Sequence, residues 1–234
     1  MTQQKMLNID ILSIVLGYSK TNIGKIRTVS KKFNNCAIDN IDFYYKIKSA
    51  SDILSIPKHA TRLKFVDIFN DPVDNLPNHI THVTLGDYFN KSVDNLPNSI
   101  THLTFGWYFN QSVNNLPNSI THLTFGICFN QSVGKLPNHM AHLMFGRNFN
   151  KSVDNLPNSI THLTFGYWFN KSVNELPNSI THLIFGDKFN QSVDNLPNSI
   201  THLTFGNDFN QSVDKLPKNI KYLTIKKKTI ELTK

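Results

Sequence analysis

The sequence predicts an α+β protein in which a short helical head precedes a long parallel β-solenoid. A 20-residue period runs through most of the 234 residues, and the first part of the chain does not share it. Phenylalanine is in excess, with 17 residues against 7 Tyr and 2 Trp, which indicates a repeated phenylalanine position. We therefore expect a helical domain at 1–50, a solenoid at 51–225 and a basic tail at 226–234.

The head reads as two amphipathic helices. Leu7, Ile11 and Leu12 have the spacing of one helix face, and Val29 and Phe33 belong to a second apolar face with basic residues opposite. The head carries no copy of the 20-residue unit, so it should be a domain of its own.

The repeat gives eight full units over 56–215, and a partial ninth unit starts at Leu216. The unit at 96–115 reads LPNSITHLTFGWYFNQSVNN. Six apolar positions recur in every unit, and in this copy they are Leu96, Ile100, Leu103, Phe105, Phe109 and Val113. A unit of this size cannot bury its own core, so stacked units must share one continuous core.

Each unit should contribute one short strand and a tight return. Residues 101–105 alternate with period two, as a half-buried strand does. Pro97 precedes this segment and Gly106 ends it, which leaves no room for a long helix. The pattern is close to a leucine-rich repeat, LxxLxL followed by asparagine. Asn110 and its equivalents should then form a buried ladder that satisfies backbone groups of the neighbouring turn.

The unit LPNSITHLTFGxxFN resembles the FNIP repeat, a relative of the leucine-rich repeat found in amoebae and in large DNA viruses. The signature is Phe-Asn-x-Pro, and only the first unit keeps it whole, at Phe69 to Pro72. The other units carry serine in place of the proline. The resemblance covers about 56–225 and implies a leucine-rich-repeat-like solenoid that binds other proteins.

The head resembles an F-box. LNIDILSIVLGY matches the LPxELLxxILxYL opening, and IRTVSKKFN matches the LRxVSKxWR middle, although Asn8 replaces the usual proline and Phe33 the tryptophan. The resemblance implies docking on a Skp-type linker subunit of a cullin–RING ubiquitin ligase. The residues that match the docking positions of the family are Leu7, Ile11, Leu12, Val29 and Phe33.

Charge and cysteine content exclude several classes of function. The formal net charge is +8, yet residues 56–215 hold 10 basic and 11 acidic side chains, so no basic stripe exists for nucleic acid. Two cysteines cannot build a disulfide framework, which favours a reducing compartment. No apolar run has the ~18 residues of a membrane span. We expect a cytoplasmic or nuclear monomer that binds neither nucleic acid nor membrane, located in the host cytoplasm if the protein is viral.

A histidine recurs at one position of seven successive units. Leu103 and Phe105 should point inward, so His102 and Thr104 should point outward, and the column becomes a ladder of imidazoles about 4.8 Å apart. Metal binding is conceivable, but no carboxylate or cysteine shares the column to close a coordination set. We predict no metal site and no cofactor, and interpret the column as a hydrogen-bonding surface ladder. Its members are His82, His102, His122, His142, His162, His182 and His202.

Two positions after each glycine vary while the rest of the unit repeats. Both tryptophans of the chain lie there, together with several tyrosines. Trp, Tyr and Arg dominate interface hot spots, and variable loops on a rigid scaffold often carry recognition. The predicted partner-binding residues are Tyr88, Trp107, Tyr108, Arg147, Tyr167 and Trp168 on these turns and His102, His122 and His162 on the ladder.

No catalytic constellation emerges, because the acidic residues do not converge and identical histidines do not make one distinct base. The sequence therefore predicts a non-enzymatic substrate-recognition adaptor of a ubiquitin ligase, with the solenoid holding the target protein. One alternative is an interaction scaffold with no link to ubiquitin. A second alternative is a metal-dependent module that uses the histidine ladder. Lys226–Lys228 is a candidate nuclear signal, but we favour its interpretation as protection of the last edge strand.

Overall fold

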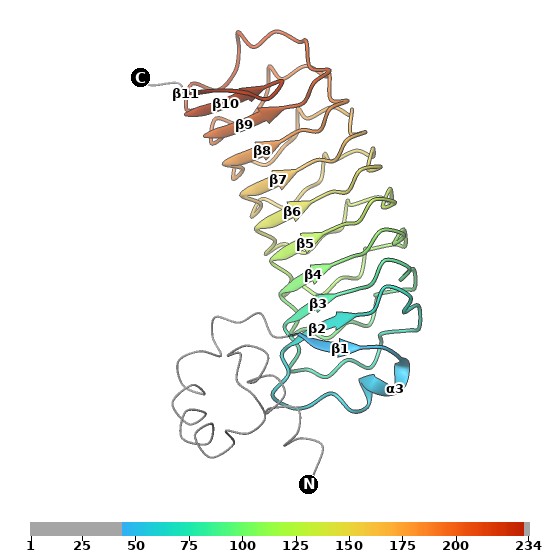
Figure 1. The fold of residues 1–234 in the computed structure, drawn as a ribbon. Helices are drawn as coiled ribbons and strands as arrows, with labels where there is room; N and C mark the ends of the chain where they lie inside the picture. The colour runs from blue at the N-terminus through green and yellow to red at the C-terminus, as the bar shows by residue number, and fades with distance from the viewer. Residues whose placement is uncertain (1–43, 232–234) are drawn as a thin grey trace, which may run out of the picture. The chain divides into compact units, whose positions relative to one another are not determined.

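The computed structural model describes residues 44–231, which belong to one compact unit beginning at Tyr44. This unit is a stack of coils whose strands lie side by side in one sheet (Figure 1). The head residues up to 43 lie outside the described residues. No helix of residues 44–231 is long and apolar enough to cross a membrane.

The sheet of the described unit has eleven strands in sequence order. The strands are β1 (Tyr45–Ile47), β2 (Arg62–Phe65), β3 (His82–Thr84), β4 (His102–Thr104), β5 (His122–Thr124), β6 (His142–Met144), β7 (His162–Thr164), β8 (His182–Ile184), β9 (His202–Phe205), β10 (Tyr222–Ile225) and β11 (Lys228–Glu231). Neighbours from β1 to β10 pair in parallel, and β3 to β9 pair with each histidine opposite the next. The predicted parallel solenoid of 20-residue repeats is confirmed.

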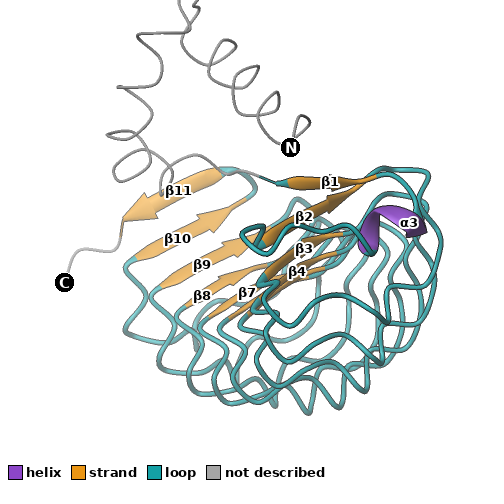
Figure 2. Ribbon diagram, turned by 90° about the horizontal axis from the view of Figure 1, so that it is seen from below, coloured by secondary structure: helices purple, strands orange, loops and turns teal. Residues whose placement is uncertain are grey.

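Tight turns complete each coil, as the loops of Figure 2 show. Ile120 donates its backbone N–H to the carbonyl of Pro117 at 3.2 Å, which closes the turn before β5. Proline suits this place because its fixed φ favours a turn and its missing N–H is not needed there. From β2 to β10 the chain therefore returns to the sheet within 20 residues without a helix.

The core consists of six stacked columns of apolar side chains, at the six positions that recur in the sequence. Phe125 is 3% exposed and Phe129 is fully buried, and their ring centroids lie 3.7 Å apart. Each ring also stacks on its equivalent one coil away, as between Phe125 and Phe145 at 5.7 Å. No polar or charged residue of the described unit is buried. Burial of these columns supplies the main stabilisation of the fold.

The predicted asparagine ladder exists, but it is only partly buried. Oδ1 of Asn110 accepts the backbone N–H of Asn130 at 2.9 Å, and Oδ1 of Asn130 accepts that of Asn150 at the same distance. The side chains lie at a turn on the rim of the core, so water still reaches them. They satisfy backbone groups of the neighbouring coil, as expected.

Both ends of the solenoid differ from the predicted domain boundaries. Strand β1 lies before residue 51 and pairs with β2, and helix α3 (Ala50–Ile53) packs Ile53 into the core of the first coil. The repeat motif does not extend into this segment, so the sequence pattern could not reveal it.

At the other end, β11 lies within the predicted tail and pairs antiparallel with β10. Lys226 and Lys227 are the two turn residues of this hairpin, with φ of 49° and 67°. Such positive φ values match the right-handed twist of a two-residue hairpin. Of the three lysines interpreted as protecting the last edge strand, only Lys228 lies in that strand, as the first residue of β11.

Candidate interaction surface

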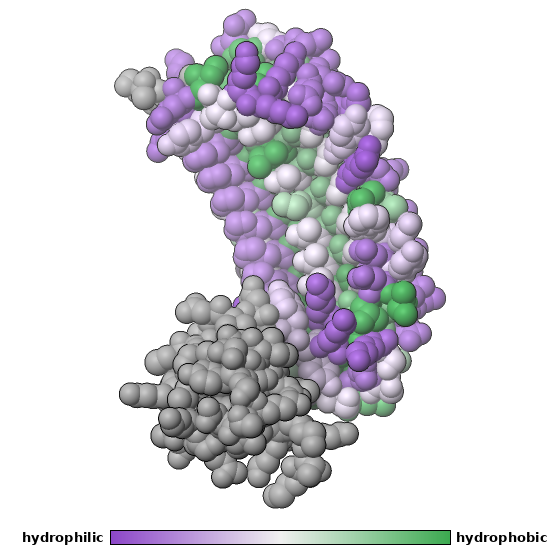
Figure 3. All heavy atoms as spheres, in the orientation of Figure 1, coloured by the Kyte–Doolittle hydropathy of each residue, from purple (hydrophilic) through white to green (hydrophobic). Residues whose placement is uncertain are grey.

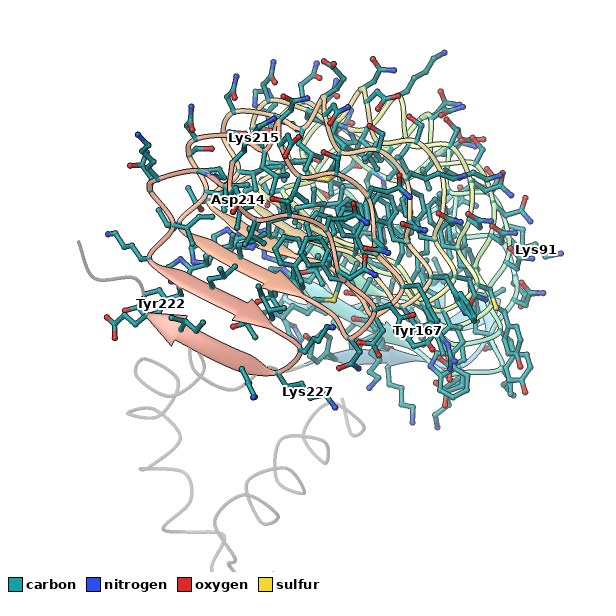
Figure 4. All side chains as sticks on the ribbon, turned by 90° about the horizontal axis from the view of Figure 1, so that it is seen from above. Lys91, Tyr167, Asp214, Lys215, Tyr222 and Lys227 are labelled. Atoms are coloured by element: carbon teal, nitrogen blue, oxygen red, sulfur yellow. The ribbon has the colours of Figure 1, made fainter. Side chains whose placement is uncertain are left out.

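The outer face of the sheet carries regular columns that run along the solenoid. The strand residue before each inward leucine forms the histidine column, which begins at Arg62 and ends at Tyr222. The strand residue that follows each inward leucine forms a threonine column. The glycine two residues after each threonine forms a glycine column. A hydrophilic strip lies beside a paler strip along this face in Figure 3. Tyr222 lies at the start of its strand and Tyr167 beyond the strand ends (Figure 4).

The seven imidazoles form the predicted ladder and stack on one another. Ring centroids of His102 and His122 lie 4.1 Å apart with an interplanar angle of 9°, and those of His122 and His142 lie 4.3 Å apart. The ladder ends on the ring of Tyr222, 4.7 Å from His202. The close spacing follows directly from the in-register parallel pairing of the strands.

At six of the seven rungs, the hydroxyl of the preceding threonine is hydrogen-bonded to Nδ1 of the imidazole. Oγ1 of Thr121 lies 2.8 Å from Nδ1 of His122, and Thr101 lies 2.9 Å from Nδ1 of His102. The equivalent contacts at the other rungs measure 2.8 or 2.9 Å. Ala141 precedes His142, so this ring has no such hydroxyl.

Four histidines of the ladder disfavour the imidazolium form. Burial lowers the pKa of His102, and the neighbouring His82 and Arg62 lower it further by charge repulsion. Burial is also the larger cause of the lowered pKa of His122 and His162, followed by the adjacent imidazoles. His182 behaves in the same way. At neutral pH these rings are uncharged.

The variable turns hold two groups of aromatic side chains, all of them exposed except the half-buried Tyr167. In the first group Tyr88, Trp107 and Tyr108 are 55%, 55% and 47% exposed, and the rings of Tyr88 and Tyr108 stack at 5.1 Å. The backbone beneath is fixed, because the N–H of Tyr108 donates to the carbonyl of Asp87 at 2.9 Å. The turns thus present aromatic surface on a rigid support.

The second group is built around Tyr167. Its ring lies 4.8 Å from that of Trp168 in an edge-to-face arrangement. Arg147 from the preceding coil lies 5.0 Å from the Tyr167 ring centroid, and Lys188 from the following coil lies 5.6 Å from it. Lys188 also forms an ion pair of 2.6 Å with Asp208, which raises the pKa of the lysine. Cations over aromatic faces attract the ring quadrupole, so these contacts orient the group.

Two exposed apolar residues on the sheet face were missed by the sequence reasoning. Met144 and Ile184 replace threonine in the threonine column and are 47% and 43% exposed. They flank Thr164 and lie in the same coils as Arg147 and Lys188. The signal was available, because these are the positions at which an otherwise regular threonine column changes to an apolar residue.

The structure therefore sorts the predicted partner-binding residues into separate places. Tyr88, Trp107 and Tyr108 form one group. Tyr167 and Trp168 form a second group with Arg147, and this group lies three coils further along the solenoid. The ladder histidines lie at the opposite end of each strand, beyond the threonine and glycine columns. The predicted docking residues of the head lie outside the described residues: Leu7, Ile11, Leu12, Val29 and Phe33. Among residues 44–231 no group of three or more metal-ligating side chains converges.

These features define a leucine-rich-repeat-like solenoid with an exposed sheet face and variable turns, an architecture consistent with protein interaction. The chain belongs to the FNIP repeat family. The family model matches more than half of the chain, at residues 92–128, 129–168, 152–188, 169–208 and 189–228.

One solved structure similar to this chain is that of CroV588, a giant-virus protein described as a novel circular leucine-rich-repeat structure. The two chains are 49% identical with a TM-score of 0.68, over 73% of this chain and 28% of CroV588. This chain thus spans under a third of the length of that relative. The comparison with curated proteins gave no match.

Proposed function

We propose that the solenoid binds a protein partner through the two aromatic groups on its variable turns. The observation that carries the proposal is the exposure of tryptophan and tyrosine on turns whose backbone is hydrogen-bonded to the next coil. Exposed aromatic side chains on a rigid support bind with little loss of conformational entropy. Met144 and Ile184 extend the second group onto the sheet face.

The test is an affinity capture with full-length protein and two paired variants. Trp107→Ala with Tyr108→Ala removes the first aromatic group, and Tyr167→Ala with Trp168→Ala removes the second. A partner that is captured by the parent should be lost with at least one pair. Lys151→Ala is the matched control, because this exposed residue lies on the return side of a coil. Equal recovery by all variants would exclude the variable turns as the binding surface.

We further propose that the chain is the substrate-recognition adaptor of a Skp–cullin–F-box ubiquitin ligase. The support is the resemblance of the head to an F-box, together with a repeat domain that suits target binding. The solenoid would hold the target, and the head would bind the linker subunit. The ligase supplies the chemistry, so the chain itself needs no catalytic group.

Leu12→Asp with Val29→Asp tests the adaptor role. The two carboxylates would have to be desolvated at the docking surface, which should abolish recovery of the linker subunit. The solenoid partner should still be captured, and its recovery shows that the rest of the protein is folded. Recovery of the linker subunit at the parental level would instead favour the scaffold that has no ubiquitin role.

A further inference from the structure

Arg147 is the cation of the second aromatic group that has no acidic partner in the described part of the chain. The other cation of the group, Lys188, is paired with Asp208 at 2.6 Å. The nearby carboxylate of Asp187 is also engaged, because its Oδ1 accepts the backbone N–H of Asn207 at 3.1 Å and the side-chain amide of Asn207 at 3.0 Å. Arg147 is exposed, so its charge faces solvent.

The contact with Tyr167 holds the Arg147 guanidinium without using its N–H groups. The guanidinium carbon lies over the Tyr167 ring, 5.0 Å from the ring centroid. A guanidinium over an aromatic ring engages its flat face, and its N–H donors remain available in the plane of the group. The backbone below is fixed as well, since the N–H of Trp168 donates to the carbonyl of Arg147 at 2.9 Å. Arg147 therefore offers a fork of donors that suits the two oxygens of a carboxylate.

The neighbouring sheet face supplies an apolar contact surface. Met144 on β6 and Ile184 on β8 are 47% and 43% exposed, and Thr164 on β7 lies between them in the same column. Two strand spacings, about 9.5 Å, separate Met144 from Ile184. The shorter threonine leaves room for one aliphatic side chain of a partner between the two larger residues. Figure 3 shows apolar side chains at intervals along this paler strip.

The charge of this site favours a single carboxylate over a phosphate. From Arg147 onward, the variable turns of four successive coils hold two basic and two acidic residues. A phosphate group carries a charge of about −1.5 to −2, so Asp187 and Asp208 would repel it. One carboxylate balances the one guanidinium that lacks a partner.

The distance between the two parts of the site limits the spacing of the groups that bind there. Arg147 follows Met144 by three residues in the same coil, which spans at most about 11 Å. An extended partner segment covers that distance in about three residues. A carboxylate and an aliphatic side chain of one short segment can therefore reach both parts of the site.

We propose that the second group recognises a protein segment in which an aspartate or glutamate lies within about four residues of an aliphatic side chain. The carboxylate binds Arg147, and the aliphatic side chain fills the space over Thr164 between Met144 and Ile184. This inference rests on the proposed binding role of the variable turns and names the chemistry of the partner at one of the two groups.

A random peptide library displayed on phage and selected on the full-length protein tests this chemistry. Enriched sequences should share an Asp or Glu within about four residues of Leu, Ile or Val. Fluorescence polarisation then measures the binding of one enriched synthetic peptide to the parent and to each variant. Arg147→Gln should weaken binding about tenfold or more. The same variant should have almost no effect on a peptide whose acidic residue is replaced by its amide.

Lys151→Gln is the matched control for charge, because it removes an exposed cation from the return side of a coil and should leave binding unchanged. Met144→Thr with Ile184→Thr tests the apolar part and should weaken binding about fivefold or more. This pair introduces the residue that most other coils carry in the column, so the fold should be kept. Circular dichroism checks the fold of each variant.

The first aromatic group separates this inference from the proposed function. Trp107→Ala with Tyr108→Ala should leave binding of the peptide unchanged, because that group lies three coils away. Peptides that depend on Trp107 and Tyr108 but not on Arg147 would overturn this inference and leave the proposed function standing. The absence of enriched peptides, enriched peptides without a carboxylate, or tighter binding when phosphoserine replaces the acidic residue would also overturn it. Peptides that depend on neither group would overturn both.

Discussion

Gly126 faces the carbonyl oxygen of Gly106 so closely that a Cβ on Gly126 would lie 1.8 Å from that oxygen and 2.4 Å from the carbonyl carbon. Backbone surrounds this position, and backbone cannot move aside as the end of a side chain can. The same contact recurs along the glycine column, where neighbouring coils pass each other just after the strand. The absence of a side chain at this position therefore allows the coils to stack this closely.

Gly126→Ala should destabilise the solenoid by about 3 kcal/mol or more, because the added carbon overlaps fixed backbone atoms. Gly134→Ala is the matched control, since its Cβ would find only the Ser132 hydroxyl, at 3.9 Å. The control should be neutral or stabilising by up to about 1 kcal/mol. Thermal unfolding measures both variants. Similar melting temperatures for the two would mean that the coils are not in contact at the glycine column.

Phe125→Ala should cost about 3–5 kcal/mol, because it removes a buried ring that stacks on three others. The neighbouring rings are Phe105 at 5.5 Å, Phe129 at 3.7 Å and Phe145 at 5.7 Å. In a nearly one-dimensional array, the loss falls on adjacent coil interfaces and can split the unfolding transition.

Ile68→Ala provides the comparison for this core variant, because Ile68 is 79% exposed and should give almost no loss. Calorimetry resolves both the melting temperature and any second transition. A Phe125→Ala protein that melts within a degree of the parent would contradict the core position of this column.

The 20-residue period made the strands, the core columns and the histidine ladder predictable, and it located the asparagine ladder but not the partial exposure of that ladder. Alternation around Leu103 sets which side chains point inward, and every later coil repeats that choice. The cation contacts of Tyr167 could not be predicted, because Arg147 and Lys188 reach the ring from different coils. The start of the solenoid at β1 was also hidden, since pairing with β2 needs no copy of the repeat motif.

Asn130→Ala should cost about 1–3 kcal/mol, because it leaves the backbone N–H of Asn150 without its acceptor in a partly buried turn. Asn130→Asp keeps an oxygen at the same place and should lose less. Chemical denaturation compares the two proteins with the parent. If the aspartate variant were as unstable as the alanine variant, the side-chain acceptor would not be the stabilising element of the ladder.

The histidine ladder also makes stability depend on pH. The folded pKa values of His102, His122 and His162 lie below the ordinary value. Burial is the larger cause, and charge repulsion from neighbouring groups is the smaller one. In the unfolded chain these groups titrate near about 6.5. Below that pH the unfolded state binds more protons than the folded state, so acid favours unfolding. The stability is complete above the unfolded pKa and falls as the pH drops toward the lower folded pKa values.

Replacing His102, His122 and His162 together by glutamine should therefore flatten the fall in unfolding free energy between about pH 7 and pH 5. Carboxylates titrate at lower pH and contribute little in that window, so the slope reports the imidazoles. The measurement is urea unfolding across this range. A control triple with His59, His79 and His139 replaced by glutamine removes as many imidazoles from outside the ladder, and its slope is compared with that of the ladder triple. If the ladder triple kept the full parental slope, the stacked rings would not be the source of the acid sensitivity.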